Sequence, residues 1–222
     1  MDPLVPKDSR RTTVDKPHQK IAQHITFFHA GVCNGRTIVV AMKKRGVDSN
    51  FKVLEPVCGD LRDPNNSKKF FAKSGLFSKM PSWFKSYMEF YIGTESYSLH
   101  FLKARLVVVC ARGFEIINLE ALSMNRNLPD PTHPDFAFVQ QKGQELRPLG
   151  MFRCKENYLL CYDAFAFMVN THGSYVREAP LIEWEGVPQA VAFYYPYVIG
   201  FDPRFIEIRH VETVSEMLIV II

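Results

Sequence analysis

The segment Leu106–Leu119 has the sequence LVVVCARGFEIINL, in which a continuous apolar run is followed by a tight turn at Arg112-Gly113 and a second run that opens with Phe. Two later segments have the same plan: Tyr158–Asn170 is YLLCYDAFAFMVN, and Tyr197–Val211 is YVIGFDPRFIEIRHV. Short apolar runs bounded by turn residues are typical of buried β-strands. The sequence therefore predicts three related β-hairpins and an all-β fold.

Each hairpin is preceded by one more expected strand, at Glu95–Leu102, Pro148–Arg153 and Gln189–Tyr195. The hairpins begin at residues 106, 158 and 197, so the spacings are 52 and 39 residues. Recurrence of a multi-strand unit at such spacings indicates the blades of a β-propeller. A β-sandwich also has short strands and turns, but it does not repeat a whole multi-strand unit. The apolar runs would then be the inner strands, covered on both faces, and outer strands such as Phe205–Val211 would alternate.

The sequence before these hairpins predicts further strands and two irregular segments. Strands are expected at Ile21–Val32, Arg36–Met42 and Phe51–Val57, and the first two are joined by the hairpin signal Asn34-Gly35. Residues 1–18 have almost nothing to bury and are expected to be a polar tail or an opened loop. Residues 58–82 lose the strand pattern and predict an insertion loop that contains a short amphipathic helix. The remainder, within residues 19–222, is expected to be one propeller domain.

Several long stretches of the chain resemble a citron homology domain, and more narrowly the one at the C-terminal end of fungal Rho-type guanine nucleotide exchange factors. The stretches that carry this resemblance are KARLVVVCARGFEIINLEAL, NYLLCYDAFAFMVNTHG and IEWEGVPQAVAFYYPYVIGFDPRFIEIRHVET. The earlier KIAQHITFFHAGVCNGRTIVVAMKKRG, FKVLEPV and EFYIGTESYSLHFLKARL are similar to that family as well. The resemblance extends from about Lys20 to about Thr213.

The resemblance implies a seven-bladed propeller that follows Dbl homology and pleckstrin homology domains. At roughly 40–45 residues per blade, 222 residues make about four to five blades. The family's first blades would precede Lys20, and further strands would follow Met217–Ile222. The expectation is therefore a partial propeller from a fragment or a truncated gene product.

The resemblance also implies a non-catalytic, protein-binding regulatory module. Its expected partner is a Rho-type small GTPase, or the cytoplasmic tail of a cortical sensor, in cell-wall integrity and actin polarity signalling. An intramolecular contact with the exchange domains is a further option. The alternative is a scaffold domain of a vacuolar or vesicle tethering protein, since related domains occur there. The long helices of an exchange domain are not found, so the chain is not expected to be an enzyme.

Motifs and composition exclude several other classes. The motifs G-x-S-x-G, H-E-x-x-H, G-x-x-x-x-G-K-[ST] and G-x-G-x-x-G are all absent, so no catalytic residue and no cofactor are predicted. The five cysteines lack zinc-ligand spacing and are expected to be buried thiols, so no metal is predicted either. No apolar run approaches the roughly 20 residues of a membrane span, and no secretory signal is present. A cytoplasmic protein is expected, with recruitment to the cell cortex or peripheral membrane association as options.

The charge is divided between the two halves of the chain. Residues 1–112 have 19 Lys+Arg and 9 Asp+Glu, a balance of +10, whereas residues 113–222 have 8 and 14, a balance of −6. No nucleic-acid-binding module accompanies the basic half, so the division suggests that charge orients a charged partner, whose kind it does not identify.

Five residues are candidates for partner binding. Lys43, Lys44 and Arg45 are expected in a turn, where three charges would project from one edge toward an acidic GTPase surface or anionic lipid, or would serve only solubility. Trp184, between two glutamates, could be an aromatic anchor for a partner or a packing residue between blades. Tyr195, in the YYPY segment, is expected in a blade turn with its hydroxyl reaching solvent.

Overall fold

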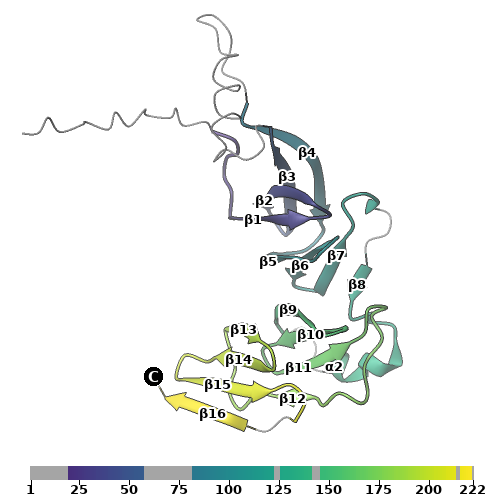
Figure 1. Cartoon of the computed structure of the whole chain (residues 1–222), viewed down its shortest axis with the longest axis vertical. Coiled ribbons are helices and arrows are strands. Elements are labelled where there is room, and N and C mark those ends of the chain that lie inside the picture. Colours follow the sequence, from purple (N-terminus) through teal and green to yellow (C-terminus); the bar gives the residue numbers. More distant parts are fainter. Residues whose placement is uncertain (1–19, 58–81, 123–125, 142–145, 214–215, 222) are drawn as a thin grey trace, which may run out of the picture.

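The computed structural model describes residues 20–57, 82–122, 126–141, 146–213 and 216–221. The described residues form four antiparallel sheets of four strands each, and each sheet is built from consecutive strands. Figure 1 shows the sheets following one another along an arc, from β1–β4 at the top to β13–β16 at the bottom. We name the sheets blades 1 to 4 in chain order.

The strand bounds of the four blades are as follows. Blade 1 contains β1 (Phe27–Cys33), β2 (Arg36–Arg45), β3 (Asp48–Pro56) and β4 (Phe84–Ile92). Blade 2 contains β5 (Ser96–Phe101), β6 (Leu106–Cys110), β7 (Gly113–Ile117) and β8 (Arg126–Leu128). Blade 3 contains β9 (Pro148–Cys154), β10 (Asn157–Tyr162), β11 (Phe165–Val169) and β12 (Ile182–Glu183), and blade 4 contains β13 (Ala190–Tyr194), β14 (Tyr197–Phe201), β15 (Phe205–His210) and β16 (Glu216–Ile221). Two short helices, η2 (Pro134–Phe136) and α2 (Ala137–Gln141), lie between blades 2 and 3 in the chain.

The first strands make the contacts between neighbouring blades. β1 contacts β5, β9 contacts β6 and β7 of blade 2, and β13 contacts β9. Three clusters of buried apolar side chains fill the spaces between blades 1 and 2, blades 2 and 3, and blades 3 and 4. This radial arrangement of four-stranded sheets confirms the predicted partial β-propeller.

The continuous apolar runs do not form the inner strands, and that part of the prediction was wrong. β6 lies between β5 and β7, and β10 and β14 hold the same second place in their sheets. Every residue of β6 is buried, with Leu106 and Val108 in the cluster against blade 1, and Val107 and Val109 in the cluster against blade 3. A second strand is apolar on both faces because it is paired along both edges and packed between two neighbouring blades.

The predicted alternation is present in β15, and its more buried side is the charged one. Glu207 and Arg209 are 2% and 7% exposed, whereas Ile206 and Ile208 are only partly buried. The side of β15 that faces blade 3 is therefore charged, and the apolar side faces away from it.

Two predicted features cannot be placed. The polar tail at residues 1–18, and the insertion loop with its helix at 58–82, lie outside the described residues except for Ser82. The first predicted strand is shorter than expected, because β1 begins only at Phe27.

Candidate functional site

A cleft lined by acidic side chains opens where blade 3 meets the connection to blade 4. Its volume is about 570 Å³, and its walls come from the β10–β11 turn, the end of β12 and the β12–β13 connection. The residues that line it, which we call the acidic cleft, are Leu146, Asp163, Ala164, Glu183, Trp184, Glu185, Gly186 and Val187.

Three carboxylates line this cleft beside apolar side chains, and one of them, Asp163, accepts the Arg147 backbone N–H at 3.0 Å. Glu183 and Glu185 are exposed, Asp163 is half-buried, and Val187 is 62% exposed. No group of three or more His, Cys, Asp or Glu side chains in the described part of the chain could hold a metal ion. The cleft therefore suits a cationic group of a partner that also has an apolar portion.

Buried carboxylates of blade 4 hold one wall of the cleft in place. The Glu185 backbone N–H donates to Glu207 Oε2 at 3.0 Å, and the Val187 N–H donates to Asp202 Oδ2 at 3.0 Å. Backbone N–H donors, from Arg204 first and Val187 second, lower the pKa of Asp202, so this carboxylate is ionised near neutral pH. Two charged acceptors thus fix the backbone that presents Glu185 and Val187.

Gly186 allows this wall to approach blade 4 closely. A Cβ added there would lie 2.7 Å from Cζ of Phe205 and 2.8 Å from Asp202 Oδ2. Only glycine fits without a shift of these neighbours.

Trp184 packs between blades 3 and 4. Its side chain is 8% exposed, its Nε1–H donates to the Tyr162 carbonyl oxygen at 2.9 Å, and its ring lies against Gly200. Of the two interpretations of Trp184, packing between blades agrees with this geometry, and the exposed groups beside it are Glu183 and Glu185.

The basic residues Lys43, Lys44 and Arg45 are the last three residues of β2 and not a turn. Successive side chains of a strand point to opposite faces, so the three charges do not form one patch. Lys44 forms an ion pair with Glu95.

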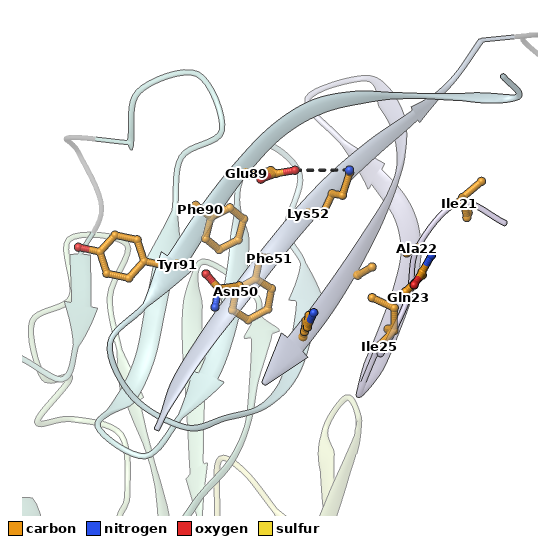
Figure 2. Close-up of a pocket in the computed structure, with 12 residues that line it drawn as sticks. Ile21, Ala22, Gln23, Ile25, Asn50, Phe51, Lys52, Glu89, Phe90 and Tyr91 are labelled. Atoms are coloured by element: carbon orange, nitrogen blue, oxygen red, sulfur yellow. Dashed lines mark ion pairs between the residues drawn. The ribbon is translucent and has the colours of Figure 1, made fainter. Parts of the chain in front are cut away.

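Lys43 lines a different pocket, of about 380 Å³, on blade 1. Figure 2 shows this pocket between β3–β4 and the segment before β1, where Ile21 and Ile25 lie. The ion pair between Lys52 of β3 and Glu89 of β4, at 3.4 Å, joins these two strands.

Tyr195 lies in the β13–β14 turn, at the other end of β13 from Trp184, and is 42% exposed. Its hydroxyl donates to Glu212 Oε1 at 2.9 Å, and Lys155 Nζ is 5.1 Å from the centroid of its ring. Lys155 in turn pairs with Glu212, which joins the turns of blades 3 and 4. The structure therefore places Tyr195, Trp184 and the three basic residues at separate locations.

Two of the carboxylates in the acidic cleft could have been proposed from the sequence. Glu183 and Glu185 flank Trp184 directly, but Asp163 is 20 residues earlier and reaches the cleft only through the β10–β11 turn.

No helix among the described residues is long and apolar enough to cross a membrane.

The half-buried imidazole of His100 predicts a pH-dependent stability. Burial first, and the charge of His29 second, lower its pKa, and its Nε2 has no hydrogen-bond partner among the described residues. The unfolded chain therefore binds a proton at higher pH than the folded one, so stability is lost as the pH falls below about 6.5 toward the folded-state pKa. We expect urea unfolding to show this loss between pH 7 and 5, with a flatter profile for His100→Phe. The exposed-site control His172→Gln should keep the wild-type slope, and an equal slope in His100→Phe would contradict the assignment to His100.

Comparison with known proteins identifies the chain's relatives. The sequence profile of the family described as "CNH domain" matches residues 1–218, a longer range than the resemblance seen in the sequence. "Rho1 guanine nucleotide exchange factor 1" of Schizosaccharomyces pombe is 40% identical over 99% of this chain and 16% of its own length. "RHO1 GDP-GTP exchange protein 2" of Saccharomyces cerevisiae is 34% identical over 89% of this chain and 14% of its own length.

A solved structure, "AfRom2 CNH domain", aligns with 34% identity and a TM-score of 0.73, covering 98% of this chain and 61% of that chain. The chain thus spans about one seventh of the curated relatives it matches and about three fifths of this solved domain. The family profile matches nearly the whole length of this chain, and a solved structure has the same fold, so the chain belongs to the CNH (citron homology) domain family.

Proposed function

We propose that this CNH domain is a non-catalytic, protein-binding regulatory module of a Rho-type guanine nucleotide exchange factor, and that its acidic cleft binds a basic segment of a Rho-family GTPase. The observation that carries the proposal is the 40% identity, over 99% of the chain, with a protein named as a Rho1 exchange factor. Because the chain corresponds to only 16% of that relative, exchange activity is assigned to the rest of such a protein.

The charge in the acidic cleft is largely uncompensated, which favours a cationic partner. Glu183 and Asp163 form no ion pair with any described residue. Glu185 has one, to Arg209 at 3.4 Å. A Lys or Arg side chain could place its charge against these carboxylates and its aliphatic stem against Val187.

The named relatives favour this function over the alternative of a vesicle-tethering scaffold, because both curated matches described above are named as exchange factors. The cytoplasmic tail of a cortical sensor remains the second partner to test, since a basic tail would present the same chemistry. Either partner would recruit a cytoplasmic exchange factor to the cell cortex, in the pathway of cell-wall integrity and actin polarity.

The proposal is tested by titrating the full chain with a purified Rho-family GTPase, loaded with GDP or with a GTP analogue, in a calorimeter. The double variant Glu183→Gln/Glu185→Gln is expected to bind about tenfold more weakly, because two charge contacts of roughly 0.5–1 kcal/mol each are removed. The matched control Glu156→Gln/Glu178→Gln removes the same charge at exposed positions outside the cleft and should keep the affinity within about twofold.

Equal losses in the two double variants would contradict the role of the acidic cleft. Absence of binding in both nucleotide states would contradict the GTPase as partner, and the same titration would then be made with a sensor-tail peptide.

A further inference from the structure

A second cleft, between blades 2 and 3, has the opposite charge. Its volume is about 590 Å³, and it lies at the end of the blades that carries the β5–β6 and β9–β10 turns. The residues that line it, which we call the basic cleft, are Phe101, Leu102, Lys103, Ala104, Arg105, Arg153, Tyr158 and Thr171.

The guanidinium of Arg153 is held in one orientation. Its Nε donates to the Lys155 carbonyl oxygen at 2.5 Å, its Nη1 donates to the Tyr158 hydroxyl at 3.2 Å, and its Cζ lies 5.2 Å from the centroid of the Tyr158 ring. All these partners are neutral, so the charge of Arg153 is oriented but not neutralised.

Lys103 and Arg105 bring two further charges from the other wall. Their turn is closed by a bond from the Leu102 N–H to the Arg105 carbonyl oxygen, 2.8 Å, and tied to blade 1 by a bond from the Asn34 N–H to the Lys103 carbonyl oxygen, 2.9 Å. Both side chains are exposed, and no ion pair involves Lys103, Arg105 or Arg153 within the described ranges. Three cations from two blades thus line one cleft without a carboxylate among its lining residues.

The chemistry of the cleft suits a phosphate monoester on an extended, partly apolar chain. Arginine binds phosphate oxygens in a planar fork and lysine adds a point charge. The hydroxyl of Thr171 supplies a further donor, and Phe101, Leu102 and Tyr158 offer apolar walls.

The surroundings favour a peptide over a membrane surface. The turns at this end of the blades carry three carboxylates. Glu120 accepts a hydrogen bond from Asn34, Glu212 forms an ion pair with Lys155, and Glu156 is the residue after Lys155. A flat anionic bilayer laid against this end would meet these carboxylates, whereas a narrow ligand that enters the cleft avoids them.

We propose that the basic cleft binds a phosphorylated serine or threonine in a peptide segment. The oriented guanidinium of Arg153 would bind two phosphate oxygens, and Lys103 and Arg105 would contact the phosphate from the other wall. This site is separate from the acidic cleft. Phosphorylation of a partner, or of another part of the same protein, would then control docking.

The test uses the full chain and an immobilised library of random peptides with a fixed central phosphothreonine, beside the same library with threonine. We expect retention on the phosphorylated library only, followed by an affinity measurement on a peptide recovered from it. Lys103→Gln/Arg105→Gln should weaken that peptide about tenfold or more, because charge-assisted contacts are lost. Lys43→Gln/Arg45→Gln removes the same charge at other exposed positions and should change the affinity less than about twofold.

Arg153→Lys separates recognition by the fork from charge alone, because it keeps the charge and loses the planar geometry, and a loss of several-fold is expected. Equal retention on both libraries, no retention on either, or equal losses in the two double variants would overturn the proposal. Stronger binding to vesicles with phosphoinositide than to any phosphopeptide would overturn it in favour of a lipid headgroup. The variant Glu183→Gln/Glu185→Gln should bind the phosphopeptide normally. A result against GTPase binding at the acidic cleft can therefore be told apart from a result against phosphopeptide binding at the basic cleft.

Discussion

Replacing Arg209 with methionine is expected to lower the free energy of unfolding by about 3–5 kcal/mol, because it leaves a buried carboxylate without its counter-charge. Arg209 Nε lies 2.5 Å from Glu207 Oε1, and the two side chains are 8% and 2% exposed. Among the described residues Glu207 has one other donor, the Glu185 N–H, which carries no full charge and cannot neutralise it. The loss would also loosen the wall of the acidic cleft that this bond holds.

Urea unfolding followed by tryptophan fluorescence measures this effect, since Trp184 lies in the same interface between blades 3 and 4. The control Arg45→Met removes an exposed arginine that forms no ion pair with any described residue, and it should cost less than about 0.5 kcal/mol. The double variant Glu207→Gln/Arg209→Met should cost less than the sum of its two single variants. A loss for Arg209→Met no larger than that of the control would show that the pair is not buried in solution.

Phe167→Ala is expected to cost about 3–5 kcal/mol through the cavity that it leaves between blades 2 and 3. Phe167 is fully buried, and its ring lies 5.1–6.0 Å, centroid to centroid, from the rings of Phe136, Phe138, Tyr162, Phe165 and Tyr175. The loss would be seen as a lower urea midpoint with an unchanged m-value.

The matched control is Phe28→Ala, because Phe28 is 69% exposed and its truncation should change stability by less than about 0.5 kcal/mol. Similar losses for the two phenylalanines would contradict the placement of Phe167 at the interface between the blades.

The repeating strands were predictable because each hairpin is written in a contiguous stretch of sequence. Apart from Asn157, the first residue of β10, the strands β6 and β7, β10 and β11, and β14 and β15 lie within Leu106–Leu119, Tyr158–Asn170 and Tyr197–Val211. The place of each strand in its blade was not predictable in the same way. A continuous apolar run shows that both faces are covered, but it does not distinguish the second strand of a blade from the first.

The short fourth strands gave no signal of their own. β8 has three residues and β12 has two, too few for any alternation to be visible.

The two clefts were not predicted, because their lining residues are far apart in the sequence. The basic cleft joins the Phe101–Arg105 turn to Arg153, Tyr158 and Thr171, and only the packing of blade 2 on blade 3 brings them together.

The buried pair Glu207–Arg209 shows a further limit of pattern reading. In Phe205–His210 the alternation was visible, but alternation alone does not say which set of residues faces blade 3. The charged set is buried here because Glu207 and Arg209, two positions apart on the same face of the strand, pair with each other.

The most direct test of the account is hydrogen–deuterium exchange of the full chain, alone and with a Rho-family GTPase in each nucleotide state. The proposed function predicts slower exchange at Glu183–Val187 and at the Asp163-Ala164 turn in at least one nucleotide state, with no change at Lys43–Arg45. Unchanged exchange around the acidic cleft in both states, or protection confined to the end of β2, would contradict the claim that this cleft binds the GTPase.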